Sequence, residues 1–261
     1  APSIQVNQPM TSALDLAFYA ISPNHTLAIN APLSGNSLSL ISAQKLDIAN
    51  VLLHARLGNI TGEAGLLHTH GTSFLAAGNI DLIPYGPLAL HTGETPIISK
   101  TTNPQGHPVT STSYPQTTIH AGGHITLKSS HGVALNGVNA IAKGNIKVQS
   151  IIDPQAAQTT DLDGCIYVES GSHKFHQVCT PPKGSSTNTE GTTNIFNAEG
   201  SLQFEGYRNV CLEAPHLTSS SSPVIQSHTG HVHIKTRFGY PTINTPTETG
   251  RVIIKTRDAS E

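Results

Sequence analysis

Short stretches in which apolar and polar residues alternate recur along this chain, and most of them open on a glycine. The element Gly-x-apolar-x-apolar begins at Gly78, Gly123, Gly144, Gly164, Gly200, Gly230 and Gly250, and a degenerate copy begins at Gly58. Because side chains alternate along a strand, the two apolar residues of each copy lie on one face and the residue between them on the other. The pattern therefore predicts many short strands, each with one buried face.

The spacing of these glycines indicates how the strands are arranged. Three of the steps between successive copies are equal, those from Gly58 to Gly78, from Gly144 to Gly164 and from Gly230 to Gly250. The basic step is thus about 20 residues, and the longer steps are that unit with insertions. A β unit of this length cannot bury its apolar face alone, so neighbouring units stack. We predict an all-β fold, a parallel β-helix (solenoid) with about 20-residue rungs and inserted loops, forming one domain over residues 1–261.

Aligning the rungs on their glycines predicts two columns of buried residues. One holds Ile60, Ile80, Ile125, Ile146, Ile166, Leu202, Val232 and Val252, and the other holds Leu82, Leu127, Val148, Val168, Phe204, Ile234 and Ile254. We expect the glycines themselves to turn the chain, since glycine takes positive φ without steric cost. The residue after the glycine is Asn59, Asn79, His124 or Asn145 in four copies. This fits either a polar ladder at a corner or ordinary Gly-Asn turn chemistry.

Three segments depart from the repeat. Residues 1–30 are expected to form an N-terminal cap or first rung, with some helical character over residues 12–20. Residues 83–118 carry six prolines, which interrupt strand pairing, and are read as a loop insertion with a small hairpin around Ile97 and Ile98. Residues 170–193 are read as a second insertion. Loops that depart from a solenoid repeat often bind partners, whereas the alternative is that they have no binding role. The candidate binding residues in these segments are Tyr85, His91, Tyr114, Phe175 and His176.

The charge balance narrows the class of partner. Charged residues make up 11% of the chain, the formal net charge is −2, and lysines and arginines are scattered. This composition argues against nucleic acid as a partner. No apolar run is long enough to span a membrane, and no dinucleotide or phosphate-binding motif predicts a cofactor. Cys165 and Cys179 could bridge the base of the second insertion; the alternative is that all three cysteines of the chain are thiols.

The histidines and two of the aspartates are candidates for a metal site or a catalytic site. Fifteen histidines include His68 with His70, and His231 and His233 near His228. Such residues can share a metal, but they also fit outward polar positions of a β-helix, and we predict no metal site. Asp161 and Asp163 lie on one face of a strand, as paired carboxylates of polysaccharide lyases or glycoside hydrolases would. They also fit a turn before Gly164.

The segment from Ala121 to Val148 carries a family resemblance. Its sequence, AGGHITLKSSHGVALNGVNAIAKGNIKV, resembles the filamentous-haemagglutinin repeats of bacterial two-partner-secretion exoproteins, which include adhesins and contact-dependent growth inhibition exoproteins. The resemblance implies a right-handed parallel β-helix, type V export through an outer-membrane transporter, and a secreted or cell-surface location.

From the repeat and the resemblance we predict a non-enzymatic segment that acts in cell adhesion and virulence. Its inserted loops would bind a host or bacterial cell-surface protein or glycan. The alternative is an exported β-helical polysaccharide lyase or glycoside hydrolase.

Overall fold

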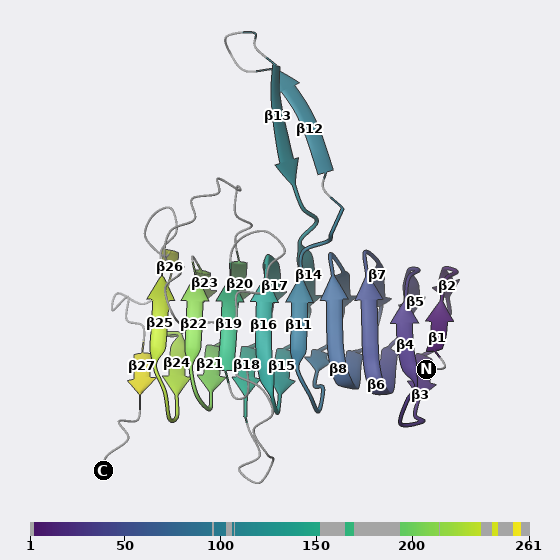
Figure 1. The fold of residues 1–261 in the computed structure, drawn as a ribbon, viewed down its shortest axis with the longest axis horizontal. Helices are drawn as coiled ribbons and strands as arrows, with labels where there is room; N and C mark the ends of the chain where they lie inside the picture. The colour runs from purple at the N-terminus through teal and green to yellow at the C-terminus, as the bar shows by residue number, and fades with distance from the viewer. Residues whose placement is uncertain are drawn as a thin grey trace.

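The structure, a computed structural model, is an all-β parallel solenoid of about eight turns with about 22 residues per turn. It describes residues 3–95, 97–102, 106, 108–151, 165–169, 194–213, 215–235, 242–244 and 253–256. The turns stack in one row from the N-terminal end to the C-terminal end (Figure 1). The predicted fold class is thereby confirmed. In the described part of the chain, no helix is long and apolar enough to cross a membrane.

Each turn contributes strands to three parallel tracks, which we number in chain order within a turn. The first track consists of β3 (Leu16–Ala20), the first half of β6 (Leu38–Ala49), the first half of β8 (Ile60–His70), β10 (Ile80–Leu82), β15 (Ile125–Ser129), β18 (Ile146–Ser150), β21 (Leu202–Gly206), β24 (Val224–Ser227) and β27 (Ile253–Thr256). The second track consists of β1 (Ser3–Val6), β4 (Thr26–Ile29), the second halves of β6 and β8, β11 (Leu88–His91), β16 (Gly132–Asn136), β19 (Cys165–Glu169), β22 (Val210–Glu213) and β25 (Val232–Lys235).

The third track forms a separate sheet. It consists of β2 (Met10–Thr11), β5 (Leu33–Gly35), β7 (Leu52–Ala55), β9 (Ser73–Ala76), β14 (Thr117–Ala121), β17 (Val138–Ala142), β20 (Asn194–Ala198), β23 (Pro215–Ser219) and β26 (Thr242–Asn244). The first and second tracks are joined into one sheet because β6 and β8 are long enough to bend around the corner between them.

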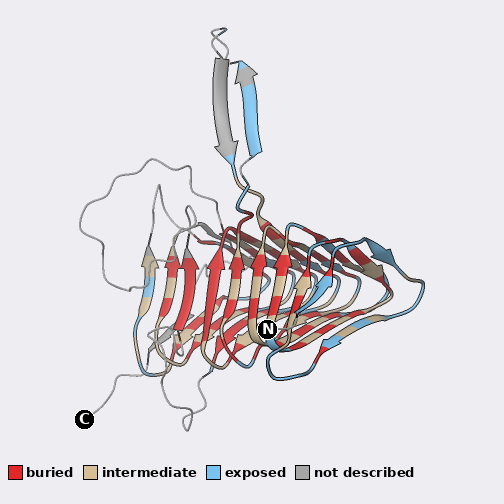
Figure 2. Ribbon diagram, turned by 45° about the vertical axis from the view of Figure 1, so that its right-hand side comes forward, coloured by how far each residue is buried: buried red, intermediate tan, exposed pale blue. Residues whose placement is uncertain are grey.

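The core is a set of apolar columns between the tracks, seen as red bands on alternate residues of the strands (Figure 2). In the first track Ile60, Ile80, Ile125, Ile146 and Leu202 are register partners, as predicted. Ile166 and Val232, however, belong to the second track, where they align with Leu88, Val133 and Val210.

Val168 and Ile234 are displaced from their predicted column in the same way. The glycine-opened element recurs at two different strands of a turn, and its apolar pattern is the same at both. Val252 lies outside the described residues.

The glycines that open the elements are needed for close approach, and the prediction of positive φ is wrong for them. Among the described residues, positive φ occurs at Asn50, Gly71, Gly106 and Gly137. A Cβ added to Gly78, Gly123, Gly144 or Gly200 would instead overlap a side chain of the preceding turn.

Those side chains form the polar ladder that the sequence suggested. Asn79 N–H donates to Asn59 Oδ1 (2.7 Å), and the next turns continue with His124 N–H to Asn79 Oδ1, Asn145 N–H to His124 Nδ1 and Ser201 N–H to Asn145 Oδ1, each at 2.8 Å.

The N-terminal segment forms strands rather than a helix. β1, β2 and β3 pair in parallel with β4, β5 and β6, so residues 3–29 begin the stack. The helical character expected over residues 12–20 is wrong, because every second residue of Leu16–Ala20 packs on the next turn.

The first insertion is narrower than predicted. Residues 88–91 form β11 within the second track, and residues 117–121 form β14 in the third. Between them β12 (Ile97–Thr102) and β13 (Pro108–Ser113) pair as an antiparallel hairpin that projects away from the stack (Figure 1). The hairpin expected around Ile97 and Ile98 is therefore confirmed. The second predicted insertion, residues 170–193, lies outside the described residues.

Candidate functional site

Three of the five predicted binding residues, Tyr85, His91 and Tyr114, lie in the part of the chain that the structure describes. Tyr85 is exposed and precedes β11, whereas His91 ends that strand, so the two lie at opposite ends of it. Tyr114 follows β13 at the foot of the hairpin and is half-buried. Phe175 and His176 lie outside the described residues. Of this set, His91 and Tyr114 flank the hairpin, and Tyr85 does not.

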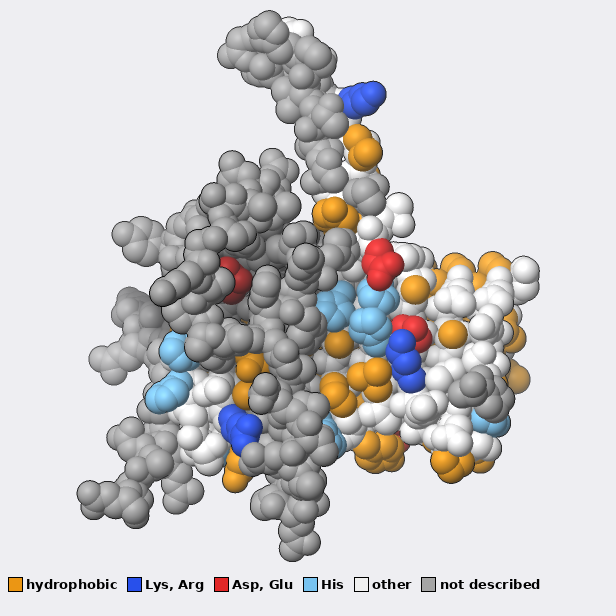
Figure 3. Space-filling model, viewed as in Figure 1, with side chains coloured by type: hydrophobic (Ala, Val, Ile, Leu, Met, Phe, Trp, Pro, Cys, Tyr) orange, Lys and Arg blue, Asp and Glu red, His pale blue; other side chains and the backbone are white. Residues whose placement is uncertain are grey.

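A cluster of histidines lies on the outer face of the second track, below the foot of the hairpin. In the space-filling view pale-blue histidine side chains there adjoin red acidic and blue basic side chains (Figure 3). His68 and His70 come from β8 and His91 from β11. Their ring centroids are 4.0 Å apart for His68 and His70, 5.3 Å for His68 and His91, and 6.0 Å for His70 and His91.

Strand alternation and register explain this cluster. In β8, Leu67 and Thr69 are fully buried, so His68 and His70 both point outward. The register places Asp47 of β6 beside His68, and His91 of β11 beside His70. The two remaining positions of this two-by-three block are Ala49 and Ala89, whose small side chains leave space around the imidazoles.

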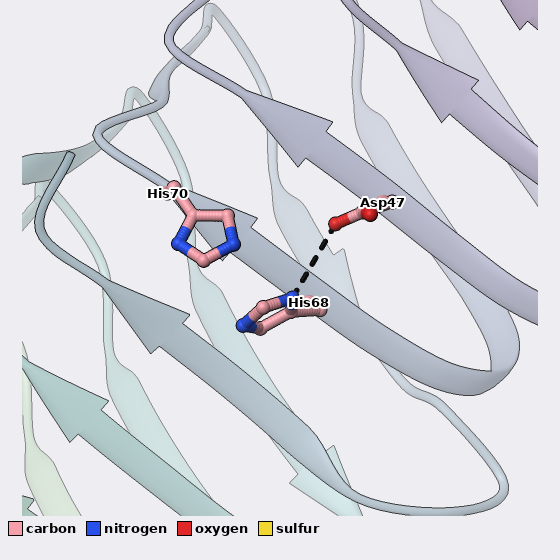
Figure 4. Close-up of side chains that lie close together, drawn as sticks. All are labelled: Asp47, His68 and His70. Atoms are coloured by element: carbon pink, nitrogen blue, oxygen red, sulfur yellow. Dashed lines mark ion pairs between the residues drawn. The ribbon is translucent and has the colours of Figure 1, made fainter. Parts of the chain in front are cut away.

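Asp47 carries the negative charge of the cluster. Its Oδ2 accepts a hydrogen bond from Lys45 Nζ at 2.8 Å, and its Oδ1 lies 3.3 Å from His68 Nδ1 (Figure 4). Contact with His68 lowers the pKa of the Asp47 carboxyl most, burial acts in the opposite direction, and Lys45 lowers it further. The net pKa lies well below its ordinary value, so Asp47 is a carboxylate at neutral pH.

The pKa of the His70 imidazole is lowered, which favours its neutral form. Burial lowers its pKa most and repulsion by His68 lowers it further, while Glu94 and Asp47 oppose both effects. Glu94 Oε1 lies 4.0 Å from His70 Nδ1 on the exposed segment that leads to the hairpin. A neutral imidazole retains a lone pair, so His70 can act as a metal ligand or hydrogen-bond acceptor.

His68 and His70 were singled out together from the sequence, but Asp47 was not recognised as their neighbour. The signal was present, because Asp47 precedes His68 by one repeat step and His91 follows His70 by the same step. Asp47, His68 and His70 each offer one ligand atom, and these atoms lie within 4.8 Å of one another.

The other predicted histidine group is spread over two tracks. His231 and His233 have ring centroids 5.9 Å apart at the start of β25. His228 follows β24, and its Nε2 lies 2.9 Å from Glu205 Oε1. Gln149 Nε2 donates to the other oxygen of Glu205 at 2.6 Å. Burial raises the pKa of Glu205 most, but the two hydrogen bonds and the charges of His228 and Lys147 together outweigh it, so the pKa is lowered.

Two further predictions concern the cysteines and the paired aspartates. Cys165 is a buried thiol and Cys211 is disulfide-bonded, so the suggested Cys165–Cys179 bridge is not formed; Cys179 lies outside the described residues. Asp161 and Asp163, on which the polysaccharide-active alternative rested, also lie outside them.

Comparison with protein-family models, with curated proteins and with solved structures found no match to this chain. The resemblance to filamentous-haemagglutinin repeats stays a prediction from the sequence.

Proposed function

We propose that this chain is a binding segment of an exported bacterial exoprotein, in which a non-enzymatic solenoid presents the β12–β13 hairpin to a cell-surface protein or glycan. The observation that carries the proposal is the hairpin itself. Export by an outer-membrane transporter and a surface location rest on the repeat resemblance and on the low share of charged residues, 11%.

Both faces of the hairpin carry exposed apolar surface. Ile97 and Ile98 are consecutive, so they point to opposite faces of the ribbon, and they are 55% and 62% exposed. Among the described strands, β12 and β13 pair with each other and with no other strand. An isolated two-stranded hairpin is marginal in water, and the apolar side chains that this projecting element exposes are available for contact with a partner. The hairpin is pale blue along β12, in contrast to the red solenoid below it (Figure 2).

The foot of the hairpin is pinned to the stack. Gly93 N–H donates to Pro115 O at 2.7 Å, and Thr117 Oγ1 donates to His91 O at 2.5 Å. The chain therefore leaves and rejoins the solenoid at adjacent points. A rigid support reduces the ordering cost that a partner must offset when it binds a loop.

The same geometry allows a clean test. Replacing residues 95–114 with a Gly-Gly linker removes the hairpin and retains β11, β14 and the Gly93–Pro115 hydrogen bond. We expect labelled parent protein to bind intact host or bacterial cells saturably and the shortened protein to lose that binding. The circular dichroism of the shortened protein, normalised to the number of residues in the solenoid, should be unchanged. Equal binding by both proteins would exclude the hairpin as the recognition element.

A double substitution in the hairpin distinguishes specific binding through its apolar side chains from nonspecific adsorption. The double change Ile97→Ser and Ile98→Ser should weaken binding, since it removes apolar contacts from both faces of β12. Leu57→Ser is the matched control, because Leu57 is 75% exposed and lies between β7 and β8, outside the hairpin. If the control reduces binding as much as the double variant, the binding is nonspecific adsorption through exposed aliphatics.

A further inference from the structure

Independently of the hairpin, the outer face of the second track carries a group of side chains suited to a metal ion. The residues are Asp47, His68 and His70, with His91 beside them (Figure 4 shows the first three). They lie on three consecutive turns, on strands β6, β8 and β11, whose parallel pairing holds their backbones in place. The backbone spacing therefore does not depend on a flexible loop.

The donor set selects a class of ion. Two imidazole nitrogens and one carboxylate oxygen suit zinc and neighbouring transition metals, whereas magnesium and calcium prefer sites built from oxygen alone. With metal–ligand bonds of about 2.0–2.1 Å, tetrahedral ligand atoms lie about 3.3–3.5 Å apart. His68 Nδ1 and Asp47 Oδ1 already lie 3.3 Å apart. The widest of the three separations is within 4.8 Å, which side-chain rotation can close.

The hydrogen bonding of Asp47 leaves one oxygen for a ligand. Oδ2 is held by Lys45 at 2.8 Å, which orients the carboxylate. Oδ1 is shielded from solvent, faces the imidazole of His68, and forms no well-aligned hydrogen bond. Orientation of a ligating carboxylate by a second partner is a regular feature of metal sites. The positive charge of Lys45 also repels a metal ion. Lys45 therefore favours metal binding by orienting the Asp47 carboxylate and disfavours it by charge repulsion.

We propose that Asp47, His68 and His70 bind one transition-metal ion of the zinc class at the surface of the solenoid, with His91 able to rotate in as a fourth ligand. While His91 is not coordinated, three protein ligands leave a coordination position open to solvent or to a group on another molecule. The half-buried imidazoles and the alanines at positions 49 and 89 leave this position accessible from outside.

The test is titration of the complete chain with ZnCl2 by isothermal titration calorimetry, and with CoCl2 by visible absorption. We expect saturable binding of one ion and the absorption of a low-coordinate Co2+ complex. The double variant His68→Ala and His70→Ala should weaken binding more than tenfold, since even residues that only orient a ligand cost about 10–100-fold. Excess MgCl2 should not compete.

A matched control distinguishes this site from any pair of surface histidines. His231→Ala and His233→Ala remove two neighbouring histidines whose rings are 5.9 Å apart and which lie near the other end of the stack. Their removal should leave the high-affinity binding unchanged. Equal loss in both double variants, or no saturable binding by the parent, would overturn the proposal.

Lys45→Met tests which effect of the ammonium on Zn2+ affinity is larger, its repulsion of the cation or its orientation of the Asp47 carboxylate. Removing the ammonium frees the second oxygen of Asp47 and abolishes repulsion of the incoming cation, so we expect tighter binding of Zn2+. Asp47→Asn should weaken binding because it removes the only negative charge among the three ligands. Unchanged binding by Asp47→Asn would contradict the assignment of Asp47 as a ligand. Circular dichroism of each variant checks that the solenoid is intact.

Discussion

Replacing Gly71 with alanine, which adds one methyl group, should test how tightly the corner between the second and third tracks is constrained. Gly71 follows His70 directly and turns the chain from the second track into the third, with φ +52°. A Cβ there would lie 2.7 Å from Asn50 Oδ1, 2.8 Å from Gly93 Cα and 2.9 Å from Gly93 N. Real Cβ atoms essentially never come within 3.0 Å of other atoms, and two of these three neighbours belong to the backbone of the next turn.

The cost of Gly71→Ala has separable parts. Left-handed backbone costs a residue with a Cβ about 1–2 kcal/mol, and overpacking a rigid site costs about 1–3 kcal/mol. Against these, alanine restricts the unfolded chain and returns about 0.4–1 kcal/mol. We therefore expect a net loss of about 3 kcal/mol in the free energy of unfolding. The backbone of Gly93 cannot move away easily, because its N–H is bonded to Pro115 O at the foot of the hairpin.

Urea unfolding followed by far-ultraviolet circular dichroism measures this loss, since the chain has no tryptophan to report by fluorescence. Gly71→Asn provides the comparison, because Asn50 takes φ +53° at the equivalent corner one turn earlier. Asparagine should relieve the backbone part and retain the overlap, so its loss should be smaller. A loss below about 0.5 kcal/mol for Gly71→Ala would show that neither the backbone conformation nor the approach of Gly93 constrains this corner.

Three further predictions test the core, the ladder and the acid response. Ile125→Ala should cost about 2–5 kcal/mol in urea unfolding, since Ile125 is fully buried between Ile80 and Ile146; a loss under about 1 kcal/mol would contradict the column. His124→Asn should leave stability within about 0.5 kcal/mol of the parent, because asparagine fills the same ladder position in neighbouring turns, whereas His124→Ala should lose about 1 kcal/mol and expose the Asn145 amide to hydrogen exchange. Because the pKa of Glu205 is lowered in the folded chain, its contribution is present above the unfolded value and lost as pH falls through the folded one. Glu205→Gln should therefore lower the thermal midpoint most at neutral pH, and the difference should vanish once the pH falls below the folded pKa; a difference that persists in strong acid would contradict this linkage.

Only some residues of the candidate sites could be predicted from the local sequence pattern. Two outward histidines at i and i+2 were evident from His68 and His70, because strand alternation depends on sequence alone. Asp47 and His91 lie beside these histidines because of the register between neighbouring strands. The repeat step implied that register, but it did not single out these two residues. The projecting hairpin followed from the interruption of the repeat, but the membership of β11 in the stack did not, because the prolines around it obscured this short strand.

The sequence by itself determined the fold class, since alternation of apolar residues and a repeat of about 20 residues leave a stacked parallel solenoid as the way to bury them. It also determined the apolar residues of the core. The tertiary structure alone decided which track each element occupies, because Gly-x-apolar-x-apolar reads the same on the first and second tracks and only pairing with neighbouring turns distinguishes them. It likewise decided the reason for the glycines. A side chain from the turn before, a full repeat or more away in sequence, occupies the space that a Cβ would need.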